Sequence, residues 1–219
     1  MIVVFDLDGT LIDSVGDLAA AASELVTALG GRALNHSEVA AMVGDGAAVL
    51  VRRALEASGL PPDTPGALPR FLEIYDRRLL DTTVAYPGIP ETLAWLSRRA
   101  RLAVLTNKPY AFSVRILEAL GLSAAFDRVI GGDGPYPRKP DPGGLRALIG
   151  ESPRALLVGD SPIDYRTAVA AGRPFVWAQY GFGAARFDGA VPETPYLLDR
   201  ASDLVEVFER FASSTAGSM

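Results

Sequence analysis

One apolar run at the N-terminus stands apart from every other strand that the sequence predicts. Residues 2–5 (Ile-Val-Val-Phe) are wholly apolar, which is typical of a strand covered on both faces. No convincing strand follows between residues 14 and 84, where apolar side chains recur at helical spacing. From residue 86 onward, short apolar runs alternate with helical segments, which favours a parallel sheet with right-handed crossovers. We therefore predict an α/β protein whose sheet takes strands from both sides of a helical insert.

This pattern predicts two domains. Residues 1–13 and 85–219 are expected to form the α/β core, and residues 14–84 a small helical cap inserted after the first strand. Further core strands are predicted at residues 102–105, 129–130, 155–158, 175–177 and 196–198. Core helices are predicted at residues 111–120, 164–171 and 202–212.

Composition excludes several classes of protein. With 49% apolar and 21% charged residues, the 219-residue chain is typical of a globular protein. Its net charge of −5 opposes binding to a nucleic-acid backbone. The absence of cysteine excludes disulfides and thiolate metal sites, and a single histidine excludes a His-rich zinc site. No membrane span or signal peptide is recognisable. We expect a cytoplasmic monomer or homodimer that binds neither nucleic acid nor membrane.

Polar side chains follow four of the predicted strands. Residues 6–10 (Asp-Leu-Asp-Gly-Thr) follow the first, residues 106–108 the second, a loop with Lys139 the third and residues 159–164 the fourth. Ligands of open α/β sheets collect at the carboxyl ends of the strands, so these groups are expected to converge. Oxygen ligands without His or Cys select a hard cation. A site with few protein ligands, which leaves room for water, suits Mg²⁺. Carboxylates around Mg²⁺, with a hydroxyl and lysines nearby, are suited to phosphoryl transfer.

The two lysines of the chain both fall beside this predicted site. Lys108 is the third residue after the second predicted strand, and Lys139 lies in the Gly/Pro-rich loop 131–144, whereas the other basic residues are arginines. A compact ammonium fits between a carboxylate and a phosphate where a planar guanidinium does not. Chance placement in a surface loop is the alternative interpretation.

In this order, the four polar segments resemble the four signatures of the haloacid dehalogenase superfamily. Residues 5–11 resemble the first signature, Thr106 the second, Lys139 the third and residues 159–164 the fourth. Each segment alone also fits a turn or a helix cap, so the resemblance depends on the ordered set. It covers nearly the whole chain and implies a Rossmann-like core with a small inserted helical cap.

The resemblance implies a role for each carboxylate. Asp6 would be the nucleophile that forms an aspartyl-phosphate, and Asp8 would act as general acid and then as general base. Mg²⁺ would be held by Asp6, by the backbone carbonyl of Asp8 and by Asp160. Asp164 would either bind the metal or orient its ligands.

The resemblance also implies the residues that bind substrate. Thr106 would hold the phosphoryl oxygens, and Lys139 would neutralise charge on the nucleophile and the phosphate, so both are also expected to be catalytic. The full set of expected substrate contacts is Thr10, Gly44, Asp45, Gly46, Thr106, Asn107, Lys108 and Lys139.

The predicted cap bears on the choice of substrate. Residues 42–55 and 11–18 resemble the cap of phosphoglycolate phosphatases, which implies 2-phosphoglycolate as the substrate. Asp45, within a Gly-x-Gly element, stands where that family commonly has asparagine. An acidic side chain near a bound carboxylate would repel it unless Arg52 or Arg53 compensated. A tight turn between helices is the other interpretation of this element.

Several functions remain open from the sequence. The leading one is a Mg²⁺-dependent phosphatase acting on a small phosphorylated metabolite. Another small-metabolite phosphatase, or a phosphotransferase similar to β-phosphoglucomutase, would use the same four segments. A dehalogenase has no alkoxide to protonate, so Asp8 counts against that reaction. A non-catalytic regulator that binds phosphate and metal would not need both Asp6 and Asp8.

Overall fold

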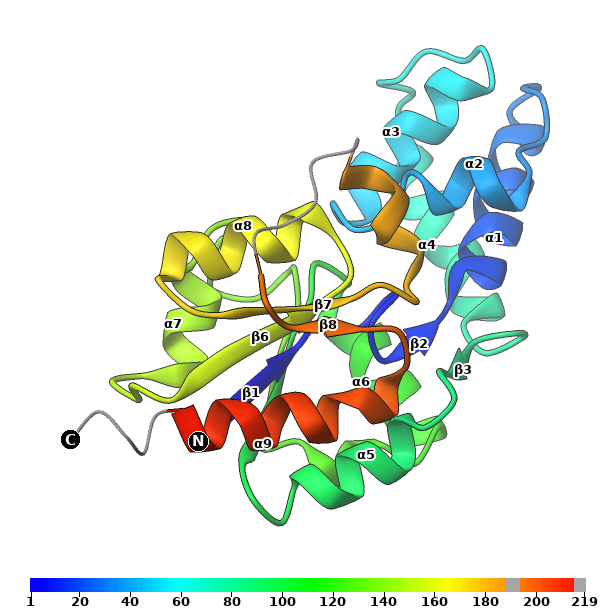
Figure 1. Ribbon diagram of the computed structural model, residues 1–219. Coiled ribbons are helices and arrows are strands. Elements are labelled where there is room, and N and C mark those ends of the chain that lie inside the picture. The colour runs from blue at the N-terminus through cyan, green and yellow to red at the C-terminus, as the bar shows by residue number, and fades with distance from the viewer. Residues whose placement is uncertain (188–193, 215–219) are drawn as a thin grey trace.

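A six-stranded parallel sheet forms the centre of the computed structural model, which describes residues 1–187 and 194–214 (Figure 1). Its strands are β1 (Ile2–Phe5), β4 (Arg101–Leu105), β5 (Arg128–Ile130), β6 (Ala155–Gly159), β7 (Phe175–Ala178) and β8 (Leu197–Leu198). The strand order is β5-β4-β1-β6-β7-β8, and each neighbouring pair is parallel. The N-terminal strand therefore lies in the middle of the sheet, between β4 and β6. The predicted Rossmann-like α/β fold class is confirmed.

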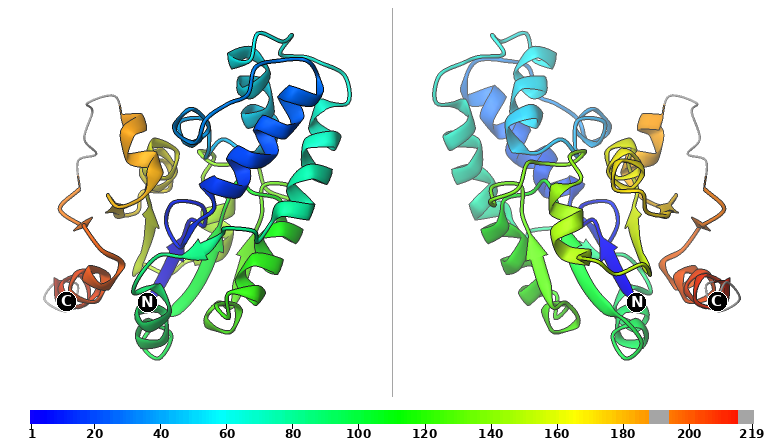
Figure 2. Two further views of the ribbon diagram at one scale, coloured as in Figure 1. Left: turned by 90° about the vertical axis from the view of Figure 1, so that its right-hand side faces the viewer. Right: turned by 90° about the vertical axis from the view of Figure 1, so that its left-hand side faces the viewer.

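Helices cover both faces of this sheet (Figures 1 and 2). One face packs against α7 (Gly143–Ile149) and α8 (Pro162–Ala171), and the other against α5 (Ile89–Leu96), α6 (Tyr110–Ala119) and α9 (Leu204–Ser214). Along β1, Val3 and Phe5 join the core on the α5 side, whereas Ile2 and Val4 join the core on the α7 side. Burial on both faces explains why this strand has no alternation of polar and apolar residues.

Four helices occupy the insert between β2 and β3 within the described residues. They are α1 (Val15–Ala28), α2 (His36–Ala40), α3 (Ala47–Ala57) and α4 (Ala67–Arg78). Both figures show them gathered at one end of the sheet. Glu24 of α1 accepts hydrogen bonds from Arg77 and Arg78 of α4 at 3.1 and 2.7 Å, which adds a polar contact to their apolar packing.

The chain passes between the insert and the core twice, at a short antiparallel ribbon of β2 (Ile12–Asp13) and β3 (Val84–Ala85). Asp17, which is 1% exposed, accepts hydrogen bonds from the backbone N–H and hydroxyl groups of Thr82 and Thr83 at 2.5–2.9 Å. These bonds tie the start of α1 to the returning chain, so both crossings are held at the base of the insert. The sequence analysis does not anticipate this ribbon, because two-residue strands show no periodicity.

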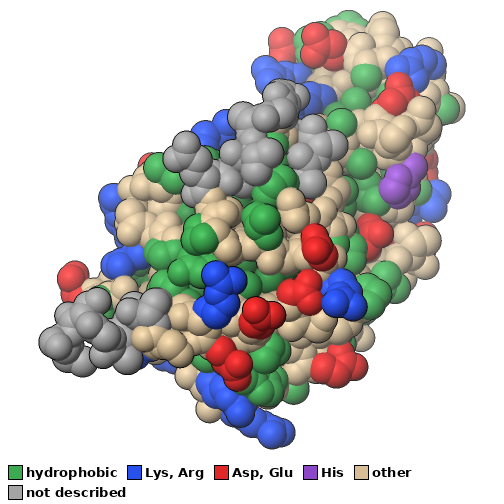
Figure 3. All heavy atoms as spheres, in the orientation of Figure 1, with side chains coloured by type: hydrophobic (Ala, Val, Ile, Leu, Met, Phe, Trp, Pro, Cys, Tyr) green, Lys and Arg blue, Asp and Glu red, His purple; other side chains and the backbone are tan. Residues whose placement is uncertain are grey.

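The division into a core domain (1–13 and 85–219) and a cap domain (14–84) stays a prediction. Residues 188–193 and 215–219 of that predicted core lie outside the described residues. On the face shown in Figure 3, acidic and basic side chains lie next to one another. None of the helices in residues 1–187 and 194–214 has the length and apolar character that a membrane span requires.

Candidate active site

The polar segments after β1, β4 and β6 meet at one edge of the sheet. Asp6, Thr106 and Asp160 each follow the last residue of one of these neighbouring strands directly. Their side chains are buried, with exposed fractions of 5%, 3% and 1%. Parallel strands bring their carboxyl ends to the same edge, which places three polar side chains from distant parts of the sequence side by side.

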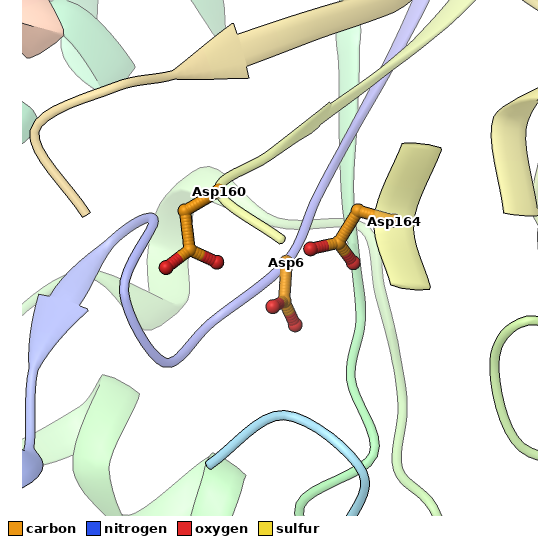
Figure 4. A group of neighbouring side chains, drawn as sticks. All are labelled: Asp6, Asp160 and Asp164. Atoms are coloured by element: carbon orange, nitrogen blue, oxygen red, sulfur yellow. The ribbon is translucent and has the colours of Figure 1, made fainter. Parts of the chain in front are cut away.

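Three buried carboxylates form a cluster at this edge (Figure 4). Oxygens of Asp6, Asp160 and Asp164 all lie within 4.8 Å of one another. Asp164 belongs to the first turn of α8, where its Oδ2 accepts from the backbone N–H and the hydroxyl of Ser161 at 3.2 and 2.6 Å. This capping box fixes the direction of the Asp164 carboxylate towards the cluster.

Lys139 supplies a positive charge to the cluster. Its ammonium nitrogen lies 2.6 Å from Asp6 Oδ1 and 2.6 Å from Asp164 Oδ1. Burial acts to lower the pKa of Lys139, but the charges of Asp164 and Asp6 outweigh it and the pKa is raised. The side chain therefore stays a cation that bridges two carboxylates.

The cluster still holds more negative than positive charge. Burial, followed by the charge of Asp164, raises the pKa of Asp6 to about 7, and the same two causes raise the pKa of Asp160. Asp160 Oδ2 accepts from the backbone N–H of Gly183 at 2.7 Å. Three carboxylates that converge in a buried site fit a hard divalent cation.

The approach of Gly9 to Asp160 also requires glycine. Gly9 has a φ of +87°, and a Cβ atom there would lie 2.0 Å from Asp160 Oδ2. The turn after β1 can therefore pass close to this carboxylate only because residue 9 has no side chain. This close approach accounts for the glycine of the Asp-Leu-Asp-Gly-Thr segment.

Asp8 has different partners from Asp6. Its Oδ1 accepts from the hydroxyl of Ser14 at 2.5 Å and from Lys108 Nζ at 2.8 Å, and its Oδ2 lies 3.2 Å from the same nitrogen. Burial acts to lower the pKa of Lys108, but Asp8, followed by Tyr75, outweighs it and the pKa is raised. The two lysines thus pair with different aspartates of one short segment. The resemblance implies that Lys139 acts on Asp6, but the sequence analysis does not anticipate that Lys108 pairs with Asp8.

Asn107 holds three segments together. Its Nδ2 donates to the backbone carbonyls of Gly44 and Lys139 at 3.0 and 3.1 Å, and its Oδ1 accepts from the Lys139 backbone N–H at 2.9 Å. Gly44 belongs to the insert, whereas Asn107 and Lys139 belong to core loops. The Asn107 side chain therefore joins the insert to the loop that carries Lys139.

The two threonines of the predicted site lie at the same edge. Thr106 Oγ1 accepts from the Lys108 backbone N–H at 3.2 Å. Thr10 Oγ1 is buried and has no hydrogen-bond partner among residues 1–187 and 194–214, while the Thr10 carbonyl accepts from the Tyr180 hydroxyl at 2.8 Å. Both hydroxyls retain donor capacity, which is what a phosphoryl-binding side chain needs.

A small, partly open cavity of about 40 Å³ lies between the core edge and the insert. This is room for a few water molecules. Asp6, Asp8, Thr106, Asn107 and Lys108 line it from the core, together with the apolar Pro109 and Phe112. The insert contributes mainly apolar side chains, namely Leu18, Val43, Ala47, Leu50, Phe71 and Leu72. One wall is therefore polar and charged, and the other is largely hydrocarbon.

The Gly-x-Gly element of the insert contributes unequally to this cavity. Gly44 and Gly46 line it, but Asp45 is not among its lining residues. The Asp45 carboxylate lies 2.6 Å from Arg53 Nη1, and the same nitrogen donates to the carbonyl of Met42 at 3.1 Å. Arg53 thus neutralises Asp45 within the insert.

Tyr75 is a lining residue that the sequence analysis does not assign to the site. It lies on an apolar stripe of α4, where its spacing indicates a core position. Its hydroxyl is buried and has no hydrogen-bond partner in the described part of the chain. Helical periodicity places such a residue on an inward face but does not reveal that a neighbouring wall is polar.

Comparisons with known proteins agree on the family. The family model described as haloacid dehalogenase-like hydrolase matches residues 3–178. A phosphoglycolate phosphatase of Pseudomonas fluorescens is 40% identical over 208 residues, which cover 90% of this chain and 75% of that protein. A phosphoglycolate phosphatase of Rhodospirillum rubrum is 42% identical over 192 residues, covering 82% of this chain and 80% of that protein.

A solved structure agrees with these relatives. The crystal structure of a predicted phosphoglycolate phosphatase from Haemophilus somnus has a TM-score of 0.84 and 28% identity, and the match covers 94% of this chain and 97% of that one. The similarity therefore extends over both the sheet and the helical insert. The chain belongs to the haloacid dehalogenase-like hydrolase family, as a phosphoric monoester hydrolase related to phosphoglycolate phosphatases.

Proposed function

We propose that this chain is a Mg²⁺-dependent phosphatase that hydrolyses 2-phosphoglycolate through an aspartyl-phosphate on Asp6. The observation that carries the proposal is the separation of two carboxylates at one cavity. Asp6 belongs to a buried acidic cluster with Lys139, whereas Asp8 is held by Ser14 and Lys108. Two carboxylates in different environments suit two different roles in one reaction.

The first role is nucleophilic attack. A carboxylate oxygen of Asp6 attacks phosphorus, and the bond between phosphorus and the ester oxygen breaks. Asp8, in its protonated form, gives its proton to the departing alkoxide. Asp8 then takes a proton from the water that attacks the aspartyl-phosphate, which releases phosphate and restores Asp6.

The cluster supports a metal-binding role for the same edge. Mg²⁺ would be held by Asp6, Asp160 and the backbone carbonyl of Asp8. Both oxygens of Asp164 already have protein partners, so its proposed role is to orient Lys139 and Ser161. When bound, Mg²⁺ supplies positive charge to the phosphoryl oxygens.

The other proposed site residues act on the phosphate or on access to it. Thr106 and Lys139 would hold and neutralise the phosphoryl group. Thr10, Asn107 and Lys108 are further proposed substrate contacts, together with Gly44 and Gly46, whereas Asp45 of the same element is paired with Arg53. The helical insert, proposed as a cap over residues 14–84, would exclude bulk water and limit substrate size. The cavity between core edge and insert supports this role, because the insert forms one of its walls.

The names of the relatives support 2-phosphoglycolate in particular. The apolar insert wall argues against a sugar phosphate, whose hydroxyl groups need several hydrogen-bond partners. Tyr75 is the one cavity-lining residue from α1 to α4 with a polar side chain among the described residues. A short substrate with few polar groups beyond the phosphate fits such a wall better.

A panel assay tests the proposal. Phosphate release is measured from 2-phosphoglycolate, sugar phosphates, nucleoside monophosphates and p-nitrophenyl phosphate, first with Mg²⁺ and then with EDTA. We expect Mg²⁺-dependent release with a strong preference for 2-phosphoglycolate. Equal activity on all esters would keep the chemistry and remove the named substrate. No release from any ester would overturn the proposal.

A further inference from the structure

Two polar groups of the cavity take no direct part in the proposed steps at phosphorus. One is the hydroxyl of Tyr75 from α4, and the other is the ammonium of Lys108 from the core. The reaction on phosphorus uses Asp6, Asp8 and the groups around Lys139. The Lys108 ammonium instead lies over the face of the Tyr75 ring, with its nitrogen 4.7 Å from the ring centre.

The Tyr75 hydroxyl is an unusual group for a protein interior. The residue is 2% exposed, and its hydroxyl makes no well-formed hydrogen bond among residues 1–187 and 194–214, although the neighbouring Lys108 ammonium acts on its pKa as a hydrogen-bond partner. A buried polar group without a partner carries a free-energy cost, so such groups usually serve a ligand or a function. The ring is held by stacking on Phe71 and by an edge contact with Phe112, which fixes where the hydroxyl lies.

The Lys108 ammonium also has unused capacity. An ammonium has three N–H donors. Within the described residues its printed hydrogen-bond acceptors are the two oxygens of Asp8, at 2.8 and 3.2 Å. At least one donor therefore remains for a further acceptor in the cavity.

No other cation lines this cavity among the described residues. Lys139 is engaged by Asp6 and Asp164, and Arg53 is engaged by Asp45. Neither Lys139 nor Arg53 is a lining residue. An anionic group at the end of the substrate away from phosphorus would meet Lys108 as its only cation.

We propose that Lys108 and Tyr75 together form the subsite for a carboxylate at the non-phosphoryl end of the substrate. The ammonium and the phenol each donate one hydrogen bond to that carboxylate. This inference rests on the proposed phosphatase function and makes the substrate class an alkyl phosphate that carries a carboxylate. The subsite is complete only when insert and core are together, because Tyr75 comes from α4 and Lys108 from the loop after β4.

Two features make the subsite chemically reasonable. Burial raises the pKa of Tyr75 to about 12, so the phenol stays a neutral donor. Lys108 would then serve two carboxylates, Asp8 and that of the substrate. Lys139 shows that one ammonium in this site can do so, since it bridges Asp6 and Asp164 at 2.6 Å each.

The test compares two esters of equal length on Tyr75→Phe, which removes only the hydroxyl. The esters are 2-phosphoglycolate and 2-hydroxyethyl phosphate, which lacks the carboxylate. For Tyr75→Phe we expect kcat/KM for 2-phosphoglycolate to fall about 10- to 100-fold, mainly through KM, with 2-hydroxyethyl phosphate changed less than about twofold. Tyr165→Phe, on α8 and packed against Phe175, is the matched control and should change neither ester.

A second variant tests the ammonium. Lys108→Gln also removes the partner of Asp8, so it is expected to slow both esters. Beyond that common effect, we expect it to reduce the preference for 2-phosphoglycolate over 2-hydroxyethyl phosphate by about 100-fold. A thermal melt checks folding, and Tyr75→Phe should leave Tm nearly unchanged, because the hydroxyl makes no well-formed hydrogen bond in the described residues and has only the Lys108 ammonium as a polar neighbour.

The outcomes separate the two proposals. Loss of activity on both esters in equal measure with either variant, or no loss with Tyr75→Phe, would overturn the subsite while the phosphatase function stood. A wild-type protein that releases phosphate from both esters without preference would do the same. Release from neither ester by the wild type would overturn the phosphatase function, and the subsite with it.

Discussion

The two walls of the cavity differ in chemistry and in how the fold builds them. The core wall carries charges placed by strand ends, and each aspartate there is paired with a lysine or a backbone donor. The insert wall is apolar apart from the hydroxyl of Tyr75. Charged groups need a rigid frame to act on phosphorus, whereas an apolar wall excludes water and selects by shape. The comparison indicates that the core carries the groups that act on phosphorus, whereas the substrate is selected where the core and the insert meet.

The largest effect is expected at the core wall, from Asp6→Asn. Turnover of all esters should fall by at least about 10⁴-fold, because an amide is a poor nucleophile for phosphorus. The fold should be retained, since Lys139 keeps Asp164 as a partner. Phosphate release and circular dichroism together check this expectation. Substantial residual turnover would remove Asp6 as the nucleophile.

Asp8→Asn should have the next largest effect. We expect kcat to fall about 10²- to 10⁴-fold on every ester, because proton transfer to the alkoxide is lost. Mg²⁺ binding should remain, since the proposed metal contact of Asp8 uses its backbone carbonyl. Calorimetric titration with Mg²⁺ measures this, with Asp160→Asn as the variant expected to lose binding. Loss of Mg²⁺ binding in Asp8→Asn would contradict the separation of the two aspartates.

Asn107→Ala tests the contact between the core and the insert. It removes the hydrogen bonds to Gly44 and Lys139, so we expect a loss of about 1–3 kcal/mol in unfolding free energy and about a tenfold lower kcat/KM. Asn35→Ala, at the other asparagine of the chain, removes the N-cap of α2 and is the control. The control should cost about 1 kcal/mol of stability without changing kinetics. Unchanged kinetics in Asn107→Ala would show that these hydrogen bonds between the insert and the core do not contribute to catalysis.

The acidic cluster predicts a pH-dependent response to Mg²⁺. The pKa of Asp6 is raised from 3.8 to about 7 in the folded protein, chiefly by burial. The folded state then binds a proton that the unfolded state has released, so the metal-free protein loses stability as pH rises through this window. Bound Mg²⁺ offsets that loss. The increase in Tm on adding Mg²⁺ should therefore be larger near pH 8 than near pH 5.

Asp160→Asn is the control for this experiment and should abolish most of the increment in Tm. A gain of 1 kcal/mol corresponds to about 2–4 °C for a chain of this size. An increment that is equal at both pH values would show that the Asp6 carboxyl is not part of the metal response.

The smallest effect is expected within the insert, from Arg53→Ala. The Arg53–Asp45 pair is partly exposed, with side-chain exposures of 34% and 23%, so its loss should cost less than about 1 kcal/mol. Activity on 2-phosphoglycolate should change less than about twofold, because neither residue lines the cavity. A selective loss of more than about tenfold would move carboxylate recognition to the insert loop and contradict the role of Lys108.

Much of the core edge could be predicted because its signals are local. Asp6, Thr106 and Asp160 stand directly after apolar runs, and one strand end is enough to place each of them. The parallel sheet then follows from the alternation of strands and helices. Helix α7 was less accessible to prediction, because its first residue, Gly143, lies inside a segment rich in glycine and proline.

The partners of the site residues could not be predicted in the same way. Lys108 lies 100 positions from Asp8 in the sequence, and Asn107 lies 63 positions from Gly44. Such contacts depend on how the insert and the loops pack against the core. A local sequence pattern carries no information about that packing. The same holds for Tyr75, whose helical spacing indicates burial but not a polar neighbour.

The sequence by itself determined the class of fold, the acidic edge of the sheet and the family. These features depend on hydrophobic periodicity and on residue types at strand ends, and both are written along the chain. Only the tertiary structure decided that Lys108 pairs with Asp8, that Asp45 forms an ion pair with Arg53, and that Tyr75 lines the cavity. The physical reason is that pairing energies act through space over a few ångströms, so they are set by the docking of segments that are distant in sequence.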